Sequence, residues 1–316
     1  MELMFSECAK LKEIKGIENL DTNNVINMCA IFQGCHELIS IDLSKFDTSK
    51  VNNISFMFDE CTKLTEKKGI ENFNTTNVMD MSAMFQSFIE LKLLNLSNLD
   101  TSNVNNMECM FNQCDKLIEI KGLEKFSTHN VNNMSGIFSE SKQLSSLNLS
   151  NFDTSKVNNM ESMFDECYAL KEIIGLERFN TINVINMSKM FKDCHELESI
   201  NISNFDTSNV NDISFMFNKC YKLKEINGIE KLNTNNVTDM SGMFQECNEI
   251  ESLNLSNFTT LKVNDISYMF NKCDKLKYLN ISNFKLSDEC NINNLFPLSN
   301  LCQIITNNPI LTQEIK

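Results

Sequence analysis

The chain is poor in the residues and motifs that mark linkers, membrane spans and catalytic sites. Its 316 residues include two prolines, eight glycines and three histidines, His36, His129 and His195. No stretch approaches the roughly 18 consecutive apolar residues of a membrane span. Gly-x-Gly-x-x-Gly, Gly-x-x-x-x-Gly-Lys-Ser/Thr and Gly-x-Ser-x-Gly are all missing. These absences predict one unbroken domain that spans no membrane, is not an enzyme and needs no cofactor.

Basic charge is also scarce. The formal net charge is −14 and the pI is near 4.8. Nucleic-acid binding requires a basic stripe, so a nucleic-acid partner is not expected. The acidic residues alternate with lysines, and none of them has the Asp-x-Asp-x-Asp-Gly spacing of a calcium loop. We therefore expect no metal site.

One motif recurs along the chain with a constant phase. It reads Met-Phe-x-x-Cys-x-x-Leu, with replacements in some copies, and its steps alternate between 27 and 26 residues as far as Phe270. A fixed period in this range indicates a solenoid, in which each coil buries its apolar side against its neighbours. The phenylalanines of the motif are Phe5, Phe32, Phe58, Phe85, Phe111, Phe138, Phe164, Phe191, Phe217, Phe244, Phe270 and Phe296.

Two unlike coils alternate, and the pair recurs every 53 residues. The shorter coil contains Leu38-Ile-Ser-Ile41-Asp-Leu43, a Leu-x-x-Leu-x-Leu strand pattern. The longer coil has an extra glycine, at Gly16, Gly69, Gly122, Gly175 and Gly228. We expect this glycine to take a positive φ in a bulge, which returns the next residue, such as Leu123, to the core side. Lys67 stands where the other longer coils have isoleucine, so a local weak point is expected there.

The remainder of each coil is expected to contain a turn and a short helix. Asp-Thr, as in Asp47-Thr48, favours a turn after the strand. The apolar residues that follow have the spacing of one helical face: Val51, Ile54, Met57, Phe58, Cys61 and Leu64. Asparagine or aspartate precedes this segment as a candidate N-cap, as at Asn53. The predicted fold is an α/β, leucine-rich-repeat-like solenoid of about 11 to 12 coils.

The repeat resembles that of a known family. The segment Leu147-Asn-Leu-Ser-Asn-Phe-Asp-Thr-Ser-Lys-Val-Asn-Asn-Met-Glu-Ser-Met-Phe164 is similar to the 26-residue repeat of bacterial surface proteins, a domain of unknown function grouped with the BspA-like leucine-rich repeats. The resemblance covers nearly the whole chain. It implies a solenoid on a cell surface, acting in adhesion, and it implies no catalytic residues.

The two ends of the chain differ from the middle. The first coil begins inside a repeat, at Met-Glu-Leu-Met-Phe5, without a signal peptide before it. We expect this uncapped coil to be a place for end-to-end association. We divide the chain into a single solenoid over residues 1–296 and a divergent C-terminal cap and tail over residues 297–316. The cap draws on Leu301, Ile304, Ile305 and Ile310, and the tail from Thr312 to Lys316 is expected to be frayed.

Nine of the 13 cysteines share one repeat position: Cys8, Cys35, Cys61, Cys114, Cys167, Cys194, Cys220, Cys247 and Cys273. Phe88 and Ser141 replace cysteine in two coils, so the position behaves as a packing site. Buried thiols are favoured, although neighbouring coils would also bring the cysteines within disulfide reach. A ladder of cysteines does not converge on one point, so zinc is not expected. Free thiols and the missing signal favour the cytoplasm, whereas the family resemblance implies the cell surface.

The outward side chains of the predicted strands form two columns, which we call the strand face. Within a coil, a glutamate and a lysine are positioned to pair in Glu13/Lys15, Glu66/Lys68 and Glu119/Lys121. In the longer coils from Glu172 onward, Ile174 and Asn227 take the place of the lysine. The face is either a solvated surface or a recognition strip. The candidate binding residues are Glu119, Lys121, Glu172, Ile174, Asn201, Glu225, Asn227, Asn254, Tyr278 and Asn280.

Three functions are compatible with these features of the sequence. The first is a non-catalytic adhesion or protein-binding solenoid that recognises a protein or cell-surface ligand through its strand face. The second is an intracellular protein-interaction scaffold. The third is a structural spacer with no specific ligand.

Overall fold

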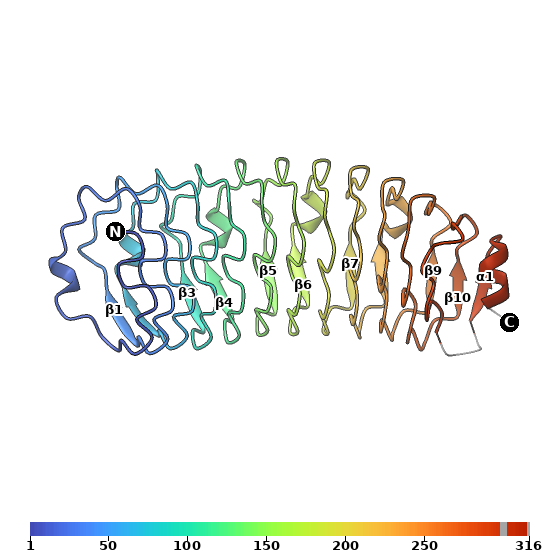
Figure 1. Cartoon of the computed structure of the whole chain (residues 1–316), viewed down its shortest axis with the longest axis horizontal. Coiled ribbons are helices and arrows are strands. Elements are labelled where there is room, and N and C mark those ends of the chain that lie inside the picture. Colours follow the sequence, from blue (N-terminus) through green and yellow to red (C-terminus); the bar gives the residue numbers. More distant parts are fainter. Residues whose placement is uncertain (298–301, 315–316) are drawn as a thin grey trace.

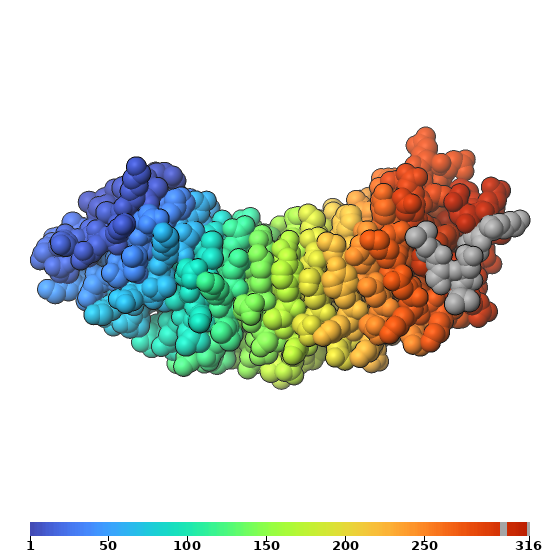
Figure 2. Space-filling view, turned by 90° about the horizontal axis from the view of Figure 1, so that it is seen from below, coloured from blue at the N-terminus to red at the C-terminus, as the bar shows by residue number. Residues whose placement is uncertain are grey.

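The structure is a computed structural model that describes residues 1–297 and 302–314. The chain winds into one elongated solenoid whose coils follow one another along the long axis (Figure 1). The solenoid is curved, with its two ends bent toward the same side (Figure 2). The predicted leucine-rich-repeat-like solenoid is confirmed.

Each strand is three residues long. In most strands the central residue is buried and the two flanking residues point outward. Where the strands of neighbouring coils pair, they run parallel and equivalent residues lie opposite each other, as Leu94 does with Ile120. The strands are β1 (Ser40–Asp42), β2 (Glu66–Lys68), β3 (Leu93–Asn95), β4 (Glu119–Lys121), β5 (Ser146–Asn148), β6 (Glu172–Ile174), β7 (Ser199–Asn201), β8 (Glu225–Asn227), β9 (Ser252–Asn254), β10 (Tyr278–Asn280) and β11 (Gln303–Ile305).

The strands do not form one continuous sheet. They pair as β1-β2, β3-β4, β5-β6 and β7-β8, and β9, β10 and β11 form a three-stranded sheet. In the described part of the chain, no ladder joins β2 to β3, β4 to β5, β6 to β7 or β8 to β9. Each break follows a longer coil, so the strand face is divided into units of two coils.

The glycine of each longer coil starts a 3₁₀ turn at the break. Its φ lies between 82° and 94°, so the predicted positive φ is confirmed. The predicted strand bulge is wrong, because the extra residue opens a 3₁₀ turn after the strand instead. Leu123 is buried as expected. The turns are η1 (Ile17–Asn19), η2 (Ile70–Asn72), η3 (Leu123–Lys125), η4 (Leu176–Arg178) and η5 (Ile229–Lys231).

The predicted short helix in each coil is wrong. Among the described residues the one α-helix is α1 (Pro309–Glu314). Alternate amides instead donate to the next coil, as Ala30 N does to Ser55 O (2.8 Å) and Phe32 N to Met57 O (3.1 Å). Phe56 and Glu60 have φ values of 55° and 57°, which interrupt a right-handed helix. The segment is a series of turns that are hydrogen-bonded between coils.

The predicted N-cap residues have a different role. Asn53 Oδ1 does accept a backbone amide, that of Ser55 at 2.8 Å, but in a turn and not at a helix. The backbones of these residues pair in parallel from coil to coil, from Asn27 with Asn53 to Asp265 with Asn291. We call this continuous series the asparagine ladder. It holds the coils together on a side of the solenoid away from the broken strand sheet.

The turn predicted after each strand is confirmed. Asp47 Oδ1 accepts the amide of Ser49 (2.9 Å), and Thr48 is buried. The same arrangement recurs at Asp153 with Ser155 (2.9 Å). A short polar side chain that hydrogen-bonds its own backbone two residues on fixes the direction in which the chain leaves the strand.

A stack of phenylalanines runs through the core. Successive rings from Phe5 to Phe270 are stacked, as in Phe58–Phe85 (6.1 Å) and Phe164–Phe191 (5.5 Å). The interior cysteines of the repeat position are buried beside them, so the predicted packing site is confirmed there. Cys61 Sγ donates to Phe32 O of the preceding coil (3.2 Å), and Ser141 Oγ makes the matching bond to Phe111 O (2.8 Å). Cys8, in the first coil, is exposed.

The divergent C-terminal segment adds one strand and one helix. Strand β11 pairs with β10, and Leu311 of α1 is buried. Thr312 to Glu314, expected to be frayed, belong to α1. Leu301, Ile315 and Lys316 lie outside the described residues, and the division at residue 296 stays a prediction. No helix in the part of the chain that the structure describes is long and apolar enough to cross a membrane.

Candidate binding face

The structure places all ten candidate binding residues on the strand face. Tyr278 and Asn280 are half-buried and the others are exposed, with Ile174 at 45%. Their strands lie along the solenoid in the order of the sequence (Figure 1). The residues therefore form a strip and do not converge on one point.

Asparagines of this strip are held by local hydrogen bonds. Asn201 Oδ1 accepts the amide of Ser203 (3.0 Å), and Asn280 Oδ1 accepts that of Ser282 (3.1 Å). Asn254 and Ser256 make the same contact (3.2 Å). Because the side-chain oxygen is used locally, a partner would meet the amide nitrogen.

The expected pairing of glutamate and lysine within a coil is found in one place. Lys15 Nζ lies 4.0 Å from Glu13 Oε2, at the limit for an ion pair. In the described part of the chain, no ion pair joins Glu66 to Lys68 or Glu119 to Lys121. The short ion pairs lie instead between coils in the loops, as in Lys63–Glu37 (2.6 Å) and Lys222–Glu196 (2.7 Å). The strand-face charges are thus mostly free for other contacts.

Clefts open where the strand sheet is broken. The first, about 380 Å³ in volume, lies between the coil of Gly16 and strand β1. A second, of about 310 Å³, lies between β2 and β3 and includes Lys67. The third, also about 310 Å³, lies between β6 and β7, and the fourth, about 210 Å³, between β8 and β9. These clefts were not predicted from the sequence, although each lies beside a Gly-Ile/Leu-Glu segment of a longer coil.

Lys67, where the sequence predicts a weak point, lines one of these clefts. It is half-buried in β2, at the position where other longer coils place an isoleucine. Burial lowers the pKa of the Lys67 ammonium, and nearby Glu71 opposes that effect. The lysine therefore costs stability relative to the isoleucine of its neighbours.

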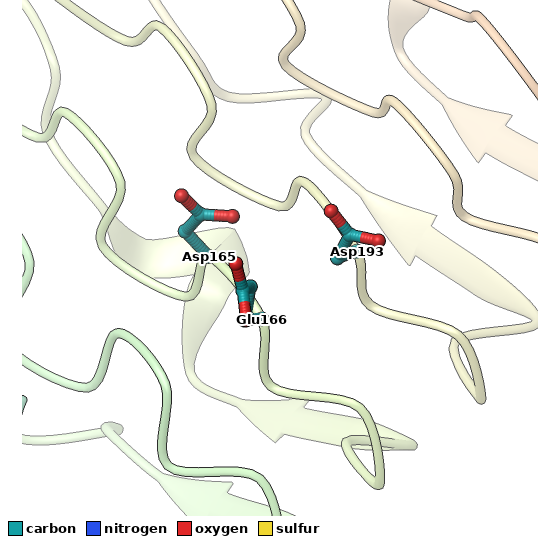
Figure 3. A group of neighbouring side chains, drawn as sticks. All are labelled: Asp165, Glu166 and Asp193. Atoms are coloured by element: carbon teal, nitrogen blue, oxygen red, sulfur yellow. The ribbon is translucent and has the colours of Figure 1, made fainter. Parts of the chain in front are cut away.

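An acidic cluster that was not predicted from the sequence lies in the loops after the Met-Phe motif. Asp165 and Glu166 on one coil and Asp193 on the next place carboxylate oxygens within 4.8 Å of one another (Figure 3). Lys192 Nζ already fills the space between them, at 3.1 Å from Asp165 and 3.0 Å from Asp193. Lys219 Nζ also lies 3.6 Å from Asp193, so two lysine ammonium groups offset most of the negative charge and take the place of a bound cation in this charge network.

An aromatic stack borders this network. The ring of His195 lies between those of Tyr168 (4.5 Å) and Tyr221 (4.6 Å). His195 Nε2 is 3.1 Å from Asp193, whereas the thiol of adjacent Cys194 is buried and bonds Phe164 O. Burial raises the pKa of the Cys194 thiol well above its usual value. Cysteine and histidine point apart, so they do not form a nucleophile and base pair.

Comparisons with known proteins define the class of this solenoid. Residues 1–118, 87–198, 145–228 and 194–307 match the family described as "Mycoplasma protein of unknown function, DUF285". The matched segments cover most of the chain, so this protein belongs to that family. No curated protein matches the sequence.

Solved structures that are similar to this chain include those of bacterial leucine-rich repeat proteins. A leucine rich cell surface protein from Faecalibacterium prausnitzii is 15% identical, with 90% of this chain and 77% of that chain covered and a TM-score of 0.50. A leucine-rich repeat protein from Bacteroides ovatus is 17% identical over 89% and 78%, with a TM-score of 0.34. An internalin from Listeria monocytogenes is 18% identical over 97% and 82%, with a TM-score of 0.31.

The family match and the fold of the first of these structures confirm the resemblance to BspA-like leucine-rich repeat proteins. At these identities the likeness establishes the fold. It assigns no ligand and no binding residue.

Proposed function

We propose that this protein is a non-catalytic binding solenoid that recognises a protein partner through the C-terminal half of its strand face, from β6 to β10. The observation that carries the proposal is the change in the strand columns. The first three longer coils place Lys15, Lys68 and Lys121 at one position, and the next two place Ile174 and Asn227 there. Deviations from a repeat are where a solenoid gains specificity.

The exposed residues of this half suit a protein partner. Ile174 is 45% exposed beside polar neighbours, and half-buried Tyr278 supplies the aromatic ring of the strip. Aromatic side chains in partly closed surroundings are common anchors in protein interfaces. The similar Faecalibacterium protein is a leucine rich cell surface protein, which supports adhesion at a cell surface as the setting.

An intracellular scaffold is the second candidate. The observation that favours it is the series of buried free thiols, from Cys35 to Cys273, which suits a reducing compartment. Both candidates use the same face, so they differ in where the partner is found.

Affinity capture with the purified chain tests the proposal. Intact cell surfaces and cytosolic lysate are probed separately with the wild type and with a variant carrying Ile174→Glu, Asn227→Lys and Tyr278→Ala. We expect a partner that the wild type retains and the variant loses, and the fraction that supplies it decides between adhesin and scaffold.

The chain offers a matched control away from the strand face. Ile185→Glu, Asn211→Lys and Tyr268→Ala make the same three chemical changes at exposed positions beside the asparagine ladder. The control variant should retain the partner. If it loses the partner equally, or if neither variant loses anything, the strand face is not the binding surface and the spacer hypothesis moves to first place.

A further inference from the structure

Two of the strand-face clefts have the same construction, 53 residues apart. The cleft between β8 and β9, here the β8 cleft, has an apolar floor of Ile226, Ile229, Ile250 and Leu253. The cleft between β6 and β7, here the β6 cleft, has Ile173, Leu176, Leu197 and Ile200 at the matching positions. One glutamate from the strand and one from the 3₁₀ turn stand at each rim: Glu225 and Glu230, and Glu172 and Glu177.

We propose that these two clefts bind lysine or arginine side chains presented by one extended basic segment of the protein partner. The inference rests on the proposed function and names the chemistry of its ligand. A lysine or arginine has an aliphatic stem that an apolar floor can cover and a cationic head that rim carboxylates can bind. No other natural side chain matches both parts of the cleft.

The N-terminal clefts differ because two lysines of this chain line each of them. Lys15 and Lys68 line the first cleft, and Lys15 lies 4.0 Å from Glu13. In the cleft between β2 and β3, Lys67 replaces the floor isoleucine and Lys121 stands opposite. The β6 cleft is lined by one lysine, Lys171, and the β8 cleft by one, Lys224. The two C-terminal clefts therefore carry fewer cations of this chain and are better placed to accept a foreign one.

The β8 cleft is the stronger of the two. Lys224, which lines it, is ion-paired elsewhere, 2.8 Å from Glu198. Within the described residues, no ion pair involves Glu225 or Glu230. In the β6 cleft, Arg178 Nε lies 3.8 Å from Glu177 and partly neutralises it. The β8 cleft therefore provides most of the affinity, and the β6 cleft adds to it.

The spacing of the clefts selects the conformation of the segment. Two coils at roughly 4.8 Å each place the clefts about 10 Å apart. A polyproline II segment advances about 3.1 Å per residue with three residues per turn, so residues three apart share a face and lie about 9.3 Å apart. A segment with a basic residue at every third position fits this interval.

A synthetic probe tests the proposal directly. A fluorescent peptide of six Pro-Pro-Lys repeats is titrated with the whole chain and binding is followed by anisotropy. The comparison peptides are six Pro-Pro-Gln repeats, and a peptide of the same composition as the probe with its lysines clustered at one end. We expect the Pro-Pro-Lys probe to bind at least tenfold more tightly than either.

Two matched variants locate the site. Glu225→Gln with Glu230→Gln removes the rim charges of the β8 cleft, and we expect at least a tenfold loss of affinity. Glu13→Gln with Glu18→Gln changes the same repeat positions beside Lys15 and changes the net charge equally. It should change the affinity by less than twofold. All four residues are exposed, so circular dichroism should show both variants folded.

Three outcomes overturn the inference. They are no binding of the probe, equal binding of the clustered peptide, and equal loss in the two variants, which would indicate general attraction to the negatively charged chain. If the peptide experiment fails but the capture experiment finds a partner whose binding depends on Ile174, Asn227 and Tyr278, this inference is wrong and the proposed function is retained. If the peptide binds through Glu225 and Glu230 but no partner is lost in the capture experiment, the clefts bind basic side chains and the proposed recognition of a protein partner is wrong.

Discussion

The hydroxyl of Thr154 holds both backbone polar groups of Asn180 in the next coil. Its Oγ1 accepts the amide of Asn180 (2.8 Å) and donates to the carbonyl of Asn180 (2.9 Å). The same two bonds join Thr181 to Asp206 (2.8 and 2.9 Å), across the break between β6 and β7. Thr154 is buried, so water cannot replace these contacts. The threonine series therefore connects coils where the strand sheet does not.

Thr154→Val should destabilise the solenoid while Thr154→Ser should not. Valine keeps the shape of threonine but leaves the amide and carbonyl of Asn180 without a partner, at a cost of about 1–3 kcal/mol. Serine retains the hydroxyl. Denaturation monitored by circular dichroism measures both changes. Equal stability of the valine and serine variants would contradict the assigned role of the hydroxyl.

Gly122→Ala should destabilise far more than Gly16→Ala. Both glycines have a positive φ, which costs an alanine about 1–2 kcal/mol. A Cβ on Gly122 would also overlap the backbone of Ser97 in the preceding coil, whereas on Gly16 the nearest atom is 3.6 Å away. We expect a loss of about 1 kcal/mol at Gly16 and more than twice that at Gly122. Equal losses would contradict this, because they would show that the coils of β3 and β4 move apart to admit the Cβ.

Asp59→Asn should raise stability near neutral pH and not at low pH. Asp59 Oδ1 is buried without a hydrogen-bond partner, and burial raises the pKa of this carboxyl above 3.8. Below pH 3.8 the folded and unfolded chains both carry the proton, so the charge costs nothing. Between the two pKa values, the unfolded chain has released this proton while the folded chain still holds it. The free energy of unfolding therefore falls as pH rises through this interval.

The measurement for Asp59 is the melting temperature at about pH 7 and about pH 3. A gain equivalent to about 1 kcal/mol is expected at neutral pH and none at the acidic pH. Gln33 and Gln86 occupy the same position in the neighbouring coils, so an amide is compatible with the site. Asp100→Asn, at an exposed turn position, is the control and should give no gain at neutral pH. A gain for Asp59→Asn that persists in acid would contradict the electrostatic cause.

Lys67→Ile should stabilise the chain. Isoleucine would restore the side chain that the other longer coils place in the cleft floor and remove a half-buried ammonium, for a gain of roughly 1–2 kcal/mol. Lys68→Ile changes the exposed neighbour in the same strand and should alter stability by less than about 0.5 kcal/mol. Equal effects of the two substitutions in thermal denaturation would show that burial of Lys67 is not the cause.

The repeat made most of the fold predictable, and its failures have local causes. The inward residues from Val51 to Leu64 have helical spacing, but a series of turns produces the same spacing when alternate amides bond the next coil. Periodicity records which side chains are buried and not where the backbone hydrogen bonds go. The positive φ of Gly122 was predictable because one extra residue had to be accommodated.

The candidate site was predictable in part. The strand columns followed from the period of two along a strand, so the positions of Ile174 and Tyr278 could be read from the sequence. The clefts could not, because they depend on which neighbouring strands pair. The network around Lys192 was missed because its carboxylates come from adjacent coils, so residues far apart in the sequence meet there.

The most direct test of the central claim is hydroxyl-radical footprinting of the chain with and without the captured partner. Oxidation of Ile174 and Tyr278 on the strand face is compared with that of Ile185 and Tyr268, which serve as matched references away from it. Recognition through the strand face predicts that oxidation of Ile174 and Tyr278 falls several-fold while the references stay constant. Protection of Ile185 and Tyr268 instead, or no difference between the two pairs, would contradict it.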